Sequence, residues 1–175
     1  MSTTWKLDAS HSEVTFKVKH MMITNVTGHF KEFEGSASSD DDQFSNAAIS
    51  FSAKTASVNT NAEQRDAHLQ SPEFFDAAKY PTIDFKGTKF TKVSGSDYKL
   101  VGTLSLHGVS KEIELDVEFG GLNKDPWGQT KAGFTVTGKI NRNDFGLTWN
   151  AALEAGGVLV SEDVKIHCEI QMIKA

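Results

Sequence analysis

The chain lacks three features that would restrict its class at once. Cysteine is limited to Cys168, so an intramolecular disulfide is impossible. No apolar run reaches the ~20 residues of a membrane-spanning helix, and the N-terminal residues lack the apolar core of a secretion signal. A net charge of −5 disfavours a broad nucleic-acid-binding face and an anchor to anionic lipid, because both are basic. We therefore expect no nucleic-acid partner and no stable membrane insertion.

The cell compartment is predicted from the same features. A single cysteine fits a reducing environment. If Met1 is the natural start, we expect a cytoplasmic protein. If a leader was removed before Met1, the periplasm is the alternative.

Motifs for catalysis and for cofactors are also missing. The chain has no Gly-x-Ser-x-Gly elbow, no phosphate-binding glycine loop and no His-Glu-x-x-His motif. Its six histidines match no common zinc spacing, and a metal role for His11, His20 and His29 is the alternative. Arg65 and Asp66 are neighbours on a predicted helix, so they do not face each other as an acid–base pair would. We therefore expect no enzyme, no cofactor and no metal.

What the chain does have is a strict alternation of apolar and polar residues, typical of strands with one dry and one wet face. The alternation is unbroken over residues 113–119 and 164–172. With the shorter segments it predicts about eight strands. Eight such strands joined by tight turns favour a closed antiparallel barrel in one domain, residues 1–175, with a β-sandwich as the alternative. Besides residues 113–119 and 164–172, the predicted strands are residues 14–19, 28–34, 49–51, 83–85, 98–106 and 134–140.

One hairpin allows the register to be predicted. His107 and Gly108 separate two long alternating segments, and two-residue hairpin turns favour glycine. Opposed residues share a face of the sheet, so the apolar sets of the two segments coincide, and the only misfit on the apolar face is Lys111 opposite Leu104. A bulge or a position at the barrel rim would explain it. The predicted pairs are Leu106 with Val109, Leu104 with Lys111, Gly102 with Ile113, and Leu100 with Leu115.

One short helix is predicted over residues 61–70. The sequence Thr-Asn-Ala-Glu over residues 60–63 resembles a capping box, and Ser71 followed by Pro72 ends the segment. About ten residues form a marginal helix alone. The helix must therefore lean on the barrel.

The interior of an eight-stranded barrel can be packed or can hold one small ligand. Gly87, Gly102 and Gly138 fall in phase with the apolar face, so they either leave gaps in the interior or mark bends and bulges. Phe74 and Phe75 follow the helix in a connecting segment. These two aromatic rings either cap one end of the barrel or line a ligand entrance.

The chain resembles the YceI-like family of bacterial lipid-binding barrels. The resemblance covers nearly the whole chain and begins with a Trp-x-x-Asp-x-x-His-Ser pattern at residues 5–12. Its most specific parts are Arg-Asp-x-His-Leu at residues 65–69 and Phe-Phe-Asp at residues 74–76. Leu-His-Gly-Val-Ser-Lys at residues 106–111 and Asn-Arg-Asn-Asp-Phe-Gly at residues 141–146 complete it.

The resemblance implies an all-β fold, an eight-stranded antiparallel lipocalin-like barrel with one short helix across one side. It also implies that the barrel binds, sequesters or transports a long apolar ligand such as a polyisoprenoid, a quinone or a fatty-acid derivative. An enzyme acting on an isoprenoid or acyl lipid is the alternative. A homodimer would be unsurprising for a barrel of this kind.

The predicted ligand site combines the apolar interior with polar residues at the mouth. A buried polar head group without partners would be costly, so we expect it near Arg65 and His68 on the helix, or near Lys111. A cation there would favour a phosphate or carboxylate. The predicted ligand-binding residues are Phe16, Val18, Phe51, Arg65, His68, Phe74, Phe75, Phe85, Gly102, Leu104, Lys111, Leu115, Phe134, Val136 and Ile166. If Gly102 faces an empty channel, Gly102→Phe should block the ligand and barely change stability.

Overall fold

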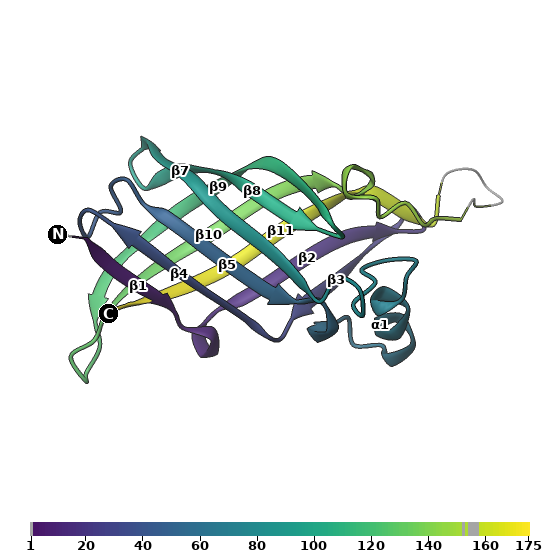
Figure 1. The fold of residues 1–175 in the computed structure, drawn as a ribbon, viewed down its shortest axis with the longest axis horizontal. Coiled ribbons are helices and arrows are strands. Elements are labelled where there is room, and N and C mark those ends of the chain that lie inside the picture. Colours follow the sequence, from purple (N-terminus) through teal and green to yellow (C-terminus); the bar gives the residue numbers. More distant parts are fainter. Residues whose placement is uncertain (1, 152, 154–157) are drawn as a thin grey trace.

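The computed structural model of the protein describes residues 2–151, 153 and 158–175, and over this part of the chain strands dominate (Figure 1). Three one-turn 3-10 helices, η1 (Ala9–His11), η2 (Thr55–Ser57) and η3 (Arg142–Phe145), accompany one α-helix, α1 (Glu63–Gln70), within these residues. The described strands are β1 (Thr3–Leu7), β2 (Glu13–His20), β3 (Thr24–Phe30), β4 (Phe33–Ser39), β5 (Ala48–Lys54), β6 (Val58–Asn59), β7 (Thr82–Ser94), β8 (Asp97–Leu106), β9 (Val109–Lys124), β10 (Thr130–Asn141) and β11 (Val160–Lys174).

The strands form a closed antiparallel barrel. Hydrogen bonding follows the order β1-β4-β5-β7-β8-β9-β10-β11, and β11 pairs again with β1, which closes a ring of eight strands within the described residues. The other three strands prolong members of this ring. β2 continues from β1 along β11, β3 leads into β4, and β6 follows β5. The predicted eight-stranded barrel is confirmed.

The hairpin between β8 and β9 confirms the predicted register in every pair, including Leu104 opposite Lys111. His107 and Gly108 have φ of +55° and +75°, as a type I′ turn requires at both central positions. No register shift separates the predicted pairs. Lys111 is exposed close to the turn, so its position near the barrel rim, and not a bulge, explains the one mismatch.

The helix forms where it was predicted, but the predicted capping box is wrong. Ala62 occupies the N-cap position and makes no capping hydrogen bond with its side chain. Asn61 has a φ of +65°, which turns the chain before the helix starts. Thr60 instead donates from its backbone N–H and its Oγ1 to Asp66 Oδ1, at 2.7 and 2.6 Å. The threonine therefore bonds to the side chain of Asp66 in the first turn of α1.

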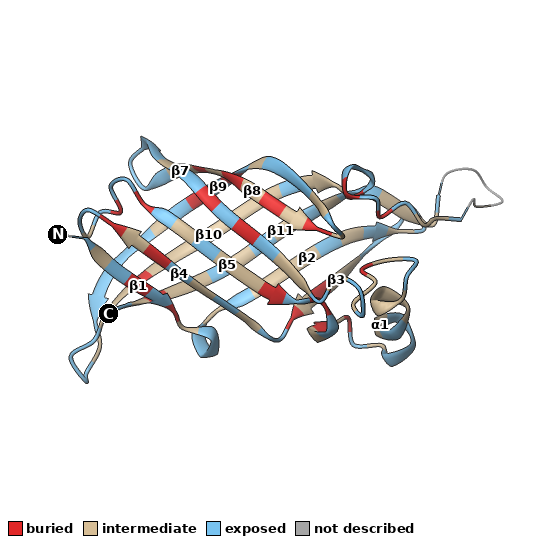
Figure 2. Cartoon of the chain, viewed as in Figure 1, coloured by how far each residue is buried: buried red, intermediate tan, exposed pale blue. Residues whose placement is uncertain are grey.

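The two ends of the barrel differ. The end that carries the chain termini is filled by a cluster of buried residues, called the packed end below (Figures 1 and 2). Phe44 enters this cluster from the loop between β4 and β5, because Asp41 accepts hydrogen bonds from the N–H groups of Gln43 and Ser45, each at 3.0 Å. The opposite end carries α1 and is called the helix end. The packed end consists of Trp5, Leu7, Ala37, Phe44, Ala47, Ala132 and Met172.

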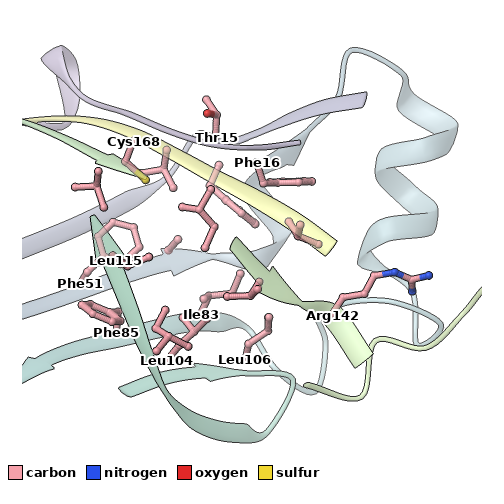
Figure 3. Close-up of a pocket in the computed structure, with 18 of the residues that line it drawn as sticks. Thr15, Phe16, Phe51, Ile83, Phe85, Leu104, Leu106, Leu115, Arg142 and Cys168 are labelled. Carbon is pink, nitrogen blue, oxygen red and sulfur yellow. The ribbon is translucent and has the colours of Figure 1, made fainter. Parts of the chain in front are cut away.

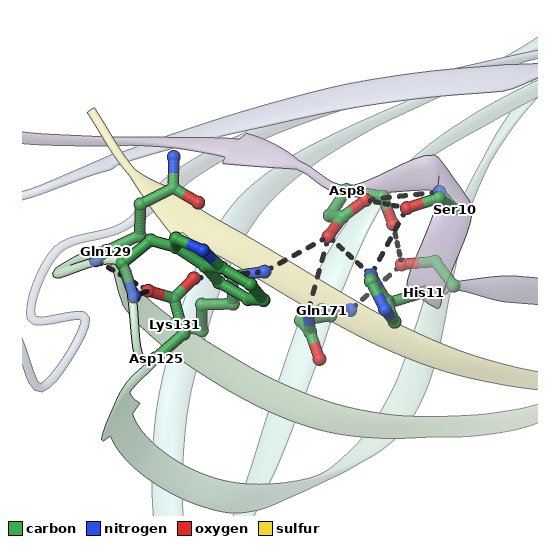
Figure 4. Close-up of polar contacts among 9 residues, drawn as sticks. Asp8, Ser10, His11, Asp125, Gln129, Lys131 and Gln171 are labelled. Carbon is green, nitrogen blue, oxygen red and sulfur yellow. Dashed lines mark hydrogen bonds and ion pairs between the residues drawn. The ribbon is translucent and has the colours of Figure 1, made fainter.

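A polar network outside the barrel fixes the packed end (Figure 4). Asp8 Oδ1 accepts from Ser10 Oγ at 2.7 Å, and Asp8 Oδ2 lies 2.8 Å from His11 Nδ1 and 3.5 Å from Lys131 Nζ. Asp8 Oδ2 also accepts from Gln171 Nε2 at 3.3 Å. The Ser10 hydroxyl, followed by His11, holds the pKa of Asp8 well below its usual range, although burial opposes the shift. This carboxylate thus joins the β1–η1 corner to β10 and β11.

Candidate ligand cavity

A cavity of about 440 Å³ occupies the interior of the barrel (Figure 3). Its volume falls within the ~300–1,000 Å³ that is typical of ligand pockets. The apolar residues of the alternating strands point into it, because successive side chains of a strand face opposite sides. It extends from the packed end, where Leu7, Phe44 and Met172 border it, to Arg65 and Trp149 at the helix end. Among the described residues, no helix is long and apolar enough to cross a bilayer.

Most of the predicted ligand-binding residues line this cavity. The five apolar residues predicted to point inward (Phe16, Phe51, Leu115, Val136 and Ile166) all border it. Gly102 and Lys111 are the two predicted residues that do not. The full set of predicted residues at its wall is Phe16, Val18, Phe51, Arg65, His68, Phe74, Phe75, Phe85, Leu104, Leu115, Phe134, Val136 and Ile166.

The interior glycines do not leave gaps. A Cβ added at Gly102 would lie 2.4 Å from the carbonyl oxygen of Lys86 and 2.5 Å from the Phe85 ring. At Gly138 it would lie 2.4 Å from Leu115 Cδ2. At Gly87 it would lie 2.9 Å from Leu100 Cδ1. Each glycine therefore lets a large side chain from a neighbouring strand lie across its backbone, and that side chain forms the wall.

This arrangement overturns the expectation for Gly102→Phe. The substitution cannot place its ring in the channel without a collision, because backbone as well as the Phe85 ring occupies the space. The barrel is hollow along its axis but packed at Gly102. The substitution should therefore destabilise the fold instead of blocking an otherwise intact channel.

Lys111 lies outside the cavity wall. Its Nζ is 3.8 Å from Asp144 Oδ1, and about half of its side chain is exposed, at 46%. Asp144 belongs to η3, so the lysine contacts the outer side of the helix end. The structure does not bring Lys111 together with Arg65 and His68 at the cavity.

Phe74 and Phe75 both border the cavity at the helix end. Phe75 is buried against Phe30, with ring centroids 5.7 Å apart. Phe74 packs against His68 and Trp149, at 5.0 and 5.3 Å between ring centroids. The two rings thus cap one end of the barrel and also line the cavity there, which joins the two alternatives left open by the sequence.

The polar residues predicted on the helix have different partners. Arg65 Nε donates to Thr60 Oγ1 at 2.7 Å, and its Nη2 donates to the Thr60 carbonyl at 2.6 Å. His68 Nε2 lies 2.5 Å from Glu73 Oε2, and its ring packs edge-on against Trp149 with centroids 4.9 Å apart. Arg65 is therefore anchored on one side, whereas His68 belongs to an aromatic cluster at the mouth.

Arg142 is a buried charged residue of the cavity wall that the sequence prediction missed. It is 3% exposed and donates to four carbonyls: Leu147 at 2.6 Å, Trp149 and Ser161 at 2.8 Å, and Val160 at 3.3 Å. Burial lowers the pKa of this guanidinium, and the charge of Glu162 opposes the shift. Its position within the Asn-Arg-Asn-Asp-Phe-Gly sequence was the available signal, but that sequence was used only for the family resemblance.

Cys168 also borders the cavity, from β11. Burial raises the pKa of its thiol to about 11, so the thiolate is scarce at neutral pH and the sulfur is a poor nucleophile. Within the residues the structure describes, no three His, Cys, Asp or Glu side chains are grouped closely enough to hold a metal ion.

The fold and the cavity together define a lipocalin-like barrel with an apolar internal site, and polar residues border this site at one end. The YceI-like domain family matches residues 5–172, and the chain belongs to this family.

Its relatives and structural neighbours agree with that assignment. A UPF0312 protein of Staphylococcus aureus strain MSSA476 is 37% identical over 170 residues, covering 97% of this chain and 96% of the relative. The crystal structure of the Campylobacter jejuni YceI protein is 37% identical, with a TM-score of 0.77 and 90% of each chain covered. A polyisoprenoid-binding domain from Saccharophagus degradans has the same fold at 17% identity, with a TM-score of 0.72 and 98% of each chain covered.

Proposed function

We propose that this protein binds one long-chain apolar ligand inside its barrel and so sequesters or transports it. The observation that carries this proposal is the cavity of about 440 Å³ along the barrel axis. Its wall consists mainly of phenylalanine, leucine, isoleucine and valine side chains. Water in such a cavity would find few partners, whereas an alkyl or prenyl chain would gain roughly 0.8 kcal/mol for each CH₂ removed from water.

The shape of the site favours a chain-like ligand. The cavity is bordered by residues of both barrel ends, from Phe44 at one to Trp149 at the other, so an occupant must be long and narrow. A polyisoprenoid, a quinone with an isoprenoid tail, or a fatty-acid derivative has this form. The polyisoprenoid-binding neighbour from Saccharophagus degradans supports the first class.

Extraction of the purified protein with organic solvent, followed by mass spectrometry, tests the proposal. We expect an intact lipid in a stoichiometric amount, or saturable binding of an added prenyl or acyl lipid by lipid-free protein. Failure of both would contradict the proposal. An enzyme acting on such a lipid, the alternative from the sequence, would release a changed product with time, which the same mass spectra would show.

Cys168 gives a second readout of occupancy. Because its thiol borders the cavity and has a pKa of about 11, only about a thousandth of it is thiolate at pH 8. Labelling by a maleimide should therefore be slow in lipid-free protein and slower still when the cavity is filled. Equal labelling rates with and without bound lipid would place the lipid elsewhere.

Two expectations stay predictions. Location in the cytoplasm, or in the periplasm if a leader was removed, is decided by fractionation of cells that express the protein from its natural gene. A homodimer is decided by light scattering on the purified protein.

A further inference from the structure

The turn between β2 and β3 carries exposed apolar side chains at the helix end of the barrel (Figure 1). Met21, Met22 and Ile23, called the apolar tip below, are 44%, 52% and 77% exposed. Val158 is exposed beside them, because the next residue, Leu159, accepts a hydrogen bond from Met21 N–H at 2.8 Å. A contiguous exposed apolar surface of this kind marks a contact with a protein or with a membrane.

The backbone of this turn does not explain why its residues are apolar. Ile23 N–H donates to the His20 carbonyl at 3.2 Å and closes the turn, whose central residues Met21 and Met22 have φ of +52° and +65°. Long side chains rarely adopt this conformation, and turns that require it favour Asn-Gly. The β8–β9 turn follows that preference with Gly108. The two methionines therefore cost conformational energy here, as strained residues at functional sites often do.

A row of lysines lies on the outer face of the sheet behind the tip. Lys17 is opposite Lys165 in the β2–β11 pairing, and Lys165 is opposite Lys139 in the β10–β11 pairing. These three exposed side chains are called the lysine row below. Like charges directly opposite each other destabilise a sheet. Lys139 Nζ lies 3.7 Å from Asp163 Oδ2, but no ion pair among the described residues includes Lys17 or Lys165.

The lysine row gives this face a charge that the whole molecule lacks. A net charge of −5 disfavours an anionic surface, but it is an average over the chain. Two acidic residues, Glu162 and Asp163, precede Lys165 on β11, and Lys19 adds a further exposed positive charge at the end of β2. The local charge of the row and Lys19 therefore exceeds that of the two acidic residues, so this face suits an anionic partner.

The spacing of the two features suits the surface of a bilayer. Lys17 precedes Met21 by four residues, which is roughly 13 Å along an extended strand. Apolar groups that bind at a membrane surface enter about 5–10 Å into the boundary of head groups and acyl chains. A tip inserted to that depth brings the long side chain of Lys17 level with the lipid phosphates.

The apolar tip is also continuous with the mouth of the cavity. His20 precedes the tip and borders the cavity, as does Leu159, which accepts from Met21. A long apolar ligand dissolves poorly in water, so its exchange is easiest where the mouth meets a lipid phase. A protein partner fits less well, because lysine is depleted in protein interfaces and a stable interface buries ~800 Å² on each side, more than a three-residue turn offers.

We propose that the apolar tip and the lysine row form a docking surface for an anionic lipid bilayer. Met21, Met22 and Ile23 enter the boundary between head groups and acyl chains, and the lysines contact the surrounding phosphates. A tip of three residues supports reversible contact and not stable insertion. Docking places the mouth of the cavity against the membrane. The inference goes beyond the proposed function, because it concerns the bilayer and not the ligand inside the barrel.

Sedimentation with vesicles tests the docking surface. The full chain is mixed with vesicles of phosphatidylcholine and phosphatidylglycerol, or with vesicles of phosphatidylcholine alone. We expect about tenfold stronger partitioning onto the anionic vesicles, and loss of most of this preference at raised salt, because exposed charges are screened. Binding to neither kind of vesicle, or equal binding to both, would overturn the proposal.

Variants of the tip separate docking from stability. The double variant Met21→Asn with Met22→Gly supplies the residue pair that the turn prefers, so it should melt at the wild-type temperature or above it. It should nevertheless bind anionic vesicles about tenfold more weakly, because the apolar side chains are gone. Ile23→Ser is a second variant with the same expected loss. Trp127→Ala is the control, because this residue is also exposed but lies at the packed end (Figure 1).

Two results would contradict the role of the tip. One is wild-type binding by the folded tip variants. The other is an equal loss of binding in Trp127→Ala.

A matched pair of charge variants tests the lysine row. Lys17→Gln with Lys165→Gln should weaken binding to anionic vesicles about 25-fold, or about fivefold for each lysine, and leave binding to phosphatidylcholine unchanged. The control is Lys89→Gln with Lys92→Gln, which removes the same charge from exposed positions on β7 and should stay within about twofold of wild type. Equal losses in the two double variants would show that net charge alone governs binding, and would overturn the docking surface.

The docking surface and the proposed function fail separately. No residue of the apolar tip borders the cavity, so the tip variants should keep wild-type affinity for palmitate or farnesol added without vesicles. A stoichiometric lipid in wild-type protein that binds no vesicles would overturn the docking surface and leave the proposed function intact. Docking on anionic vesicles by lipid-free protein that binds neither palmitate nor farnesol would support the docking surface and count against the proposed function.

Discussion

The packed end and the helix end both contain aromatic clusters, yet the structural roles of these clusters differ. At the packed end, Trp5 and Phe44 are almost completely buried, with ring centroids 4.7 Å apart. At the helix end, the ring centroids of His68 and Trp149 are 4.9 Å apart, and both residues border the cavity, whereas only Phe44 of the first pair does. The first aromatic cluster fills the interior of the barrel at its end, whereas the second borders the cavity. The comparison shows that aromatic content alone does not distinguish a core from a binding site.

The largest expected effect comes from opening the packed end. Trp5→Ala should lower the free energy of unfolding by ~3–5 kcal/mol, because Trp5 is fully buried and its removal leaves a cavity. Chemical denaturation measures the change. The control is Trp127→Ala on a residue that is 85% exposed, which should stay within about 0.5 kcal/mol. Equal losses in the two variants would mean that the packed end is not a stabilising core.

An intermediate effect is expected from the wall between the two ends. Gly102→Ala should destabilise the barrel by at least ~1–3 kcal/mol, since the new Cβ meets the Lys86 carbonyl and the Phe85 ring. The matched control is Gly133→Ala in β10, where a Cβ would find no atom within 4 Å. Thermal unfolding of both variants measures the difference. If Gly102→Ala is as stable as Gly133→Ala, the interior at Gly102 is not packed as described.

The smallest expected effect concerns the network outside the packed end. The pKa of Asp8 is lowered in the folded protein, so its contribution to stability is present above the unfolded pKa of ~3.9. That contribution is lost as the pH falls through the lower folded value. Asp8→Asn should therefore cost about 1 kcal/mol at pH 7, a modest value for a partly solvated network.

The pH dependence is the check on that prediction. The stability difference between wild type and Asp8→Asn should shrink as the pH falls from about 4 into the strongly acidic range. Denaturant unfolding at pH 7 and at successive acid values measures it. A difference that grew on acidification would mean that the sign of the pKa shift is wrong.

The barrel could be predicted from the sequence because its strands alternate with period two and its β8–β9 turn has a clear register. The interruption of ring strands, such as the break between β3 and β4, could not be predicted from this periodicity. Residues 28–34 were read as one strand, but the structure divides them between β3 and β4 at Lys31 and Glu32. The carbonyl of Glu32 accepts from Lys54 N–H at 2.9 Å, and Lys31 N–H donates to the Ser57 carbonyl at 3.1 Å. These bonds, to Lys54 just before η2 and to Ser57 at its last residue, have no local signature in the sequence.

The candidate site was predicted in part for the same reason. Strand periodicity identifies which residues face inward, so apolar wall residues such as Phe16 and Ile166 were found. Periodicity cannot say what fills the space in front of an inward glycine, because at Gly102 that depends on how Phe85 of the neighbouring strand lies. Nor does it reveal Arg142, whose carbonyl partners lie as far along the chain as Ser161. Both features arise only from tertiary contacts.

The pairing of β11 with β1 and β2 has a consequence for the folding pathway. The neighbouring pairs β7–β8, β8–β9 and β9–β10 are joined by short hairpins, whereas this seam joins residues as distant as Ile166 and Phe16. Closing it carries the largest loop entropy of any pairing in the barrel, so it should form late. Until it forms, the apolar wall is exposed to water and to other chains, which makes the open barrel the species most prone to aggregate. Cys168 lies opposite Val14 across this seam, so the time at which its thiol becomes protected during refolding should report the moment of closure.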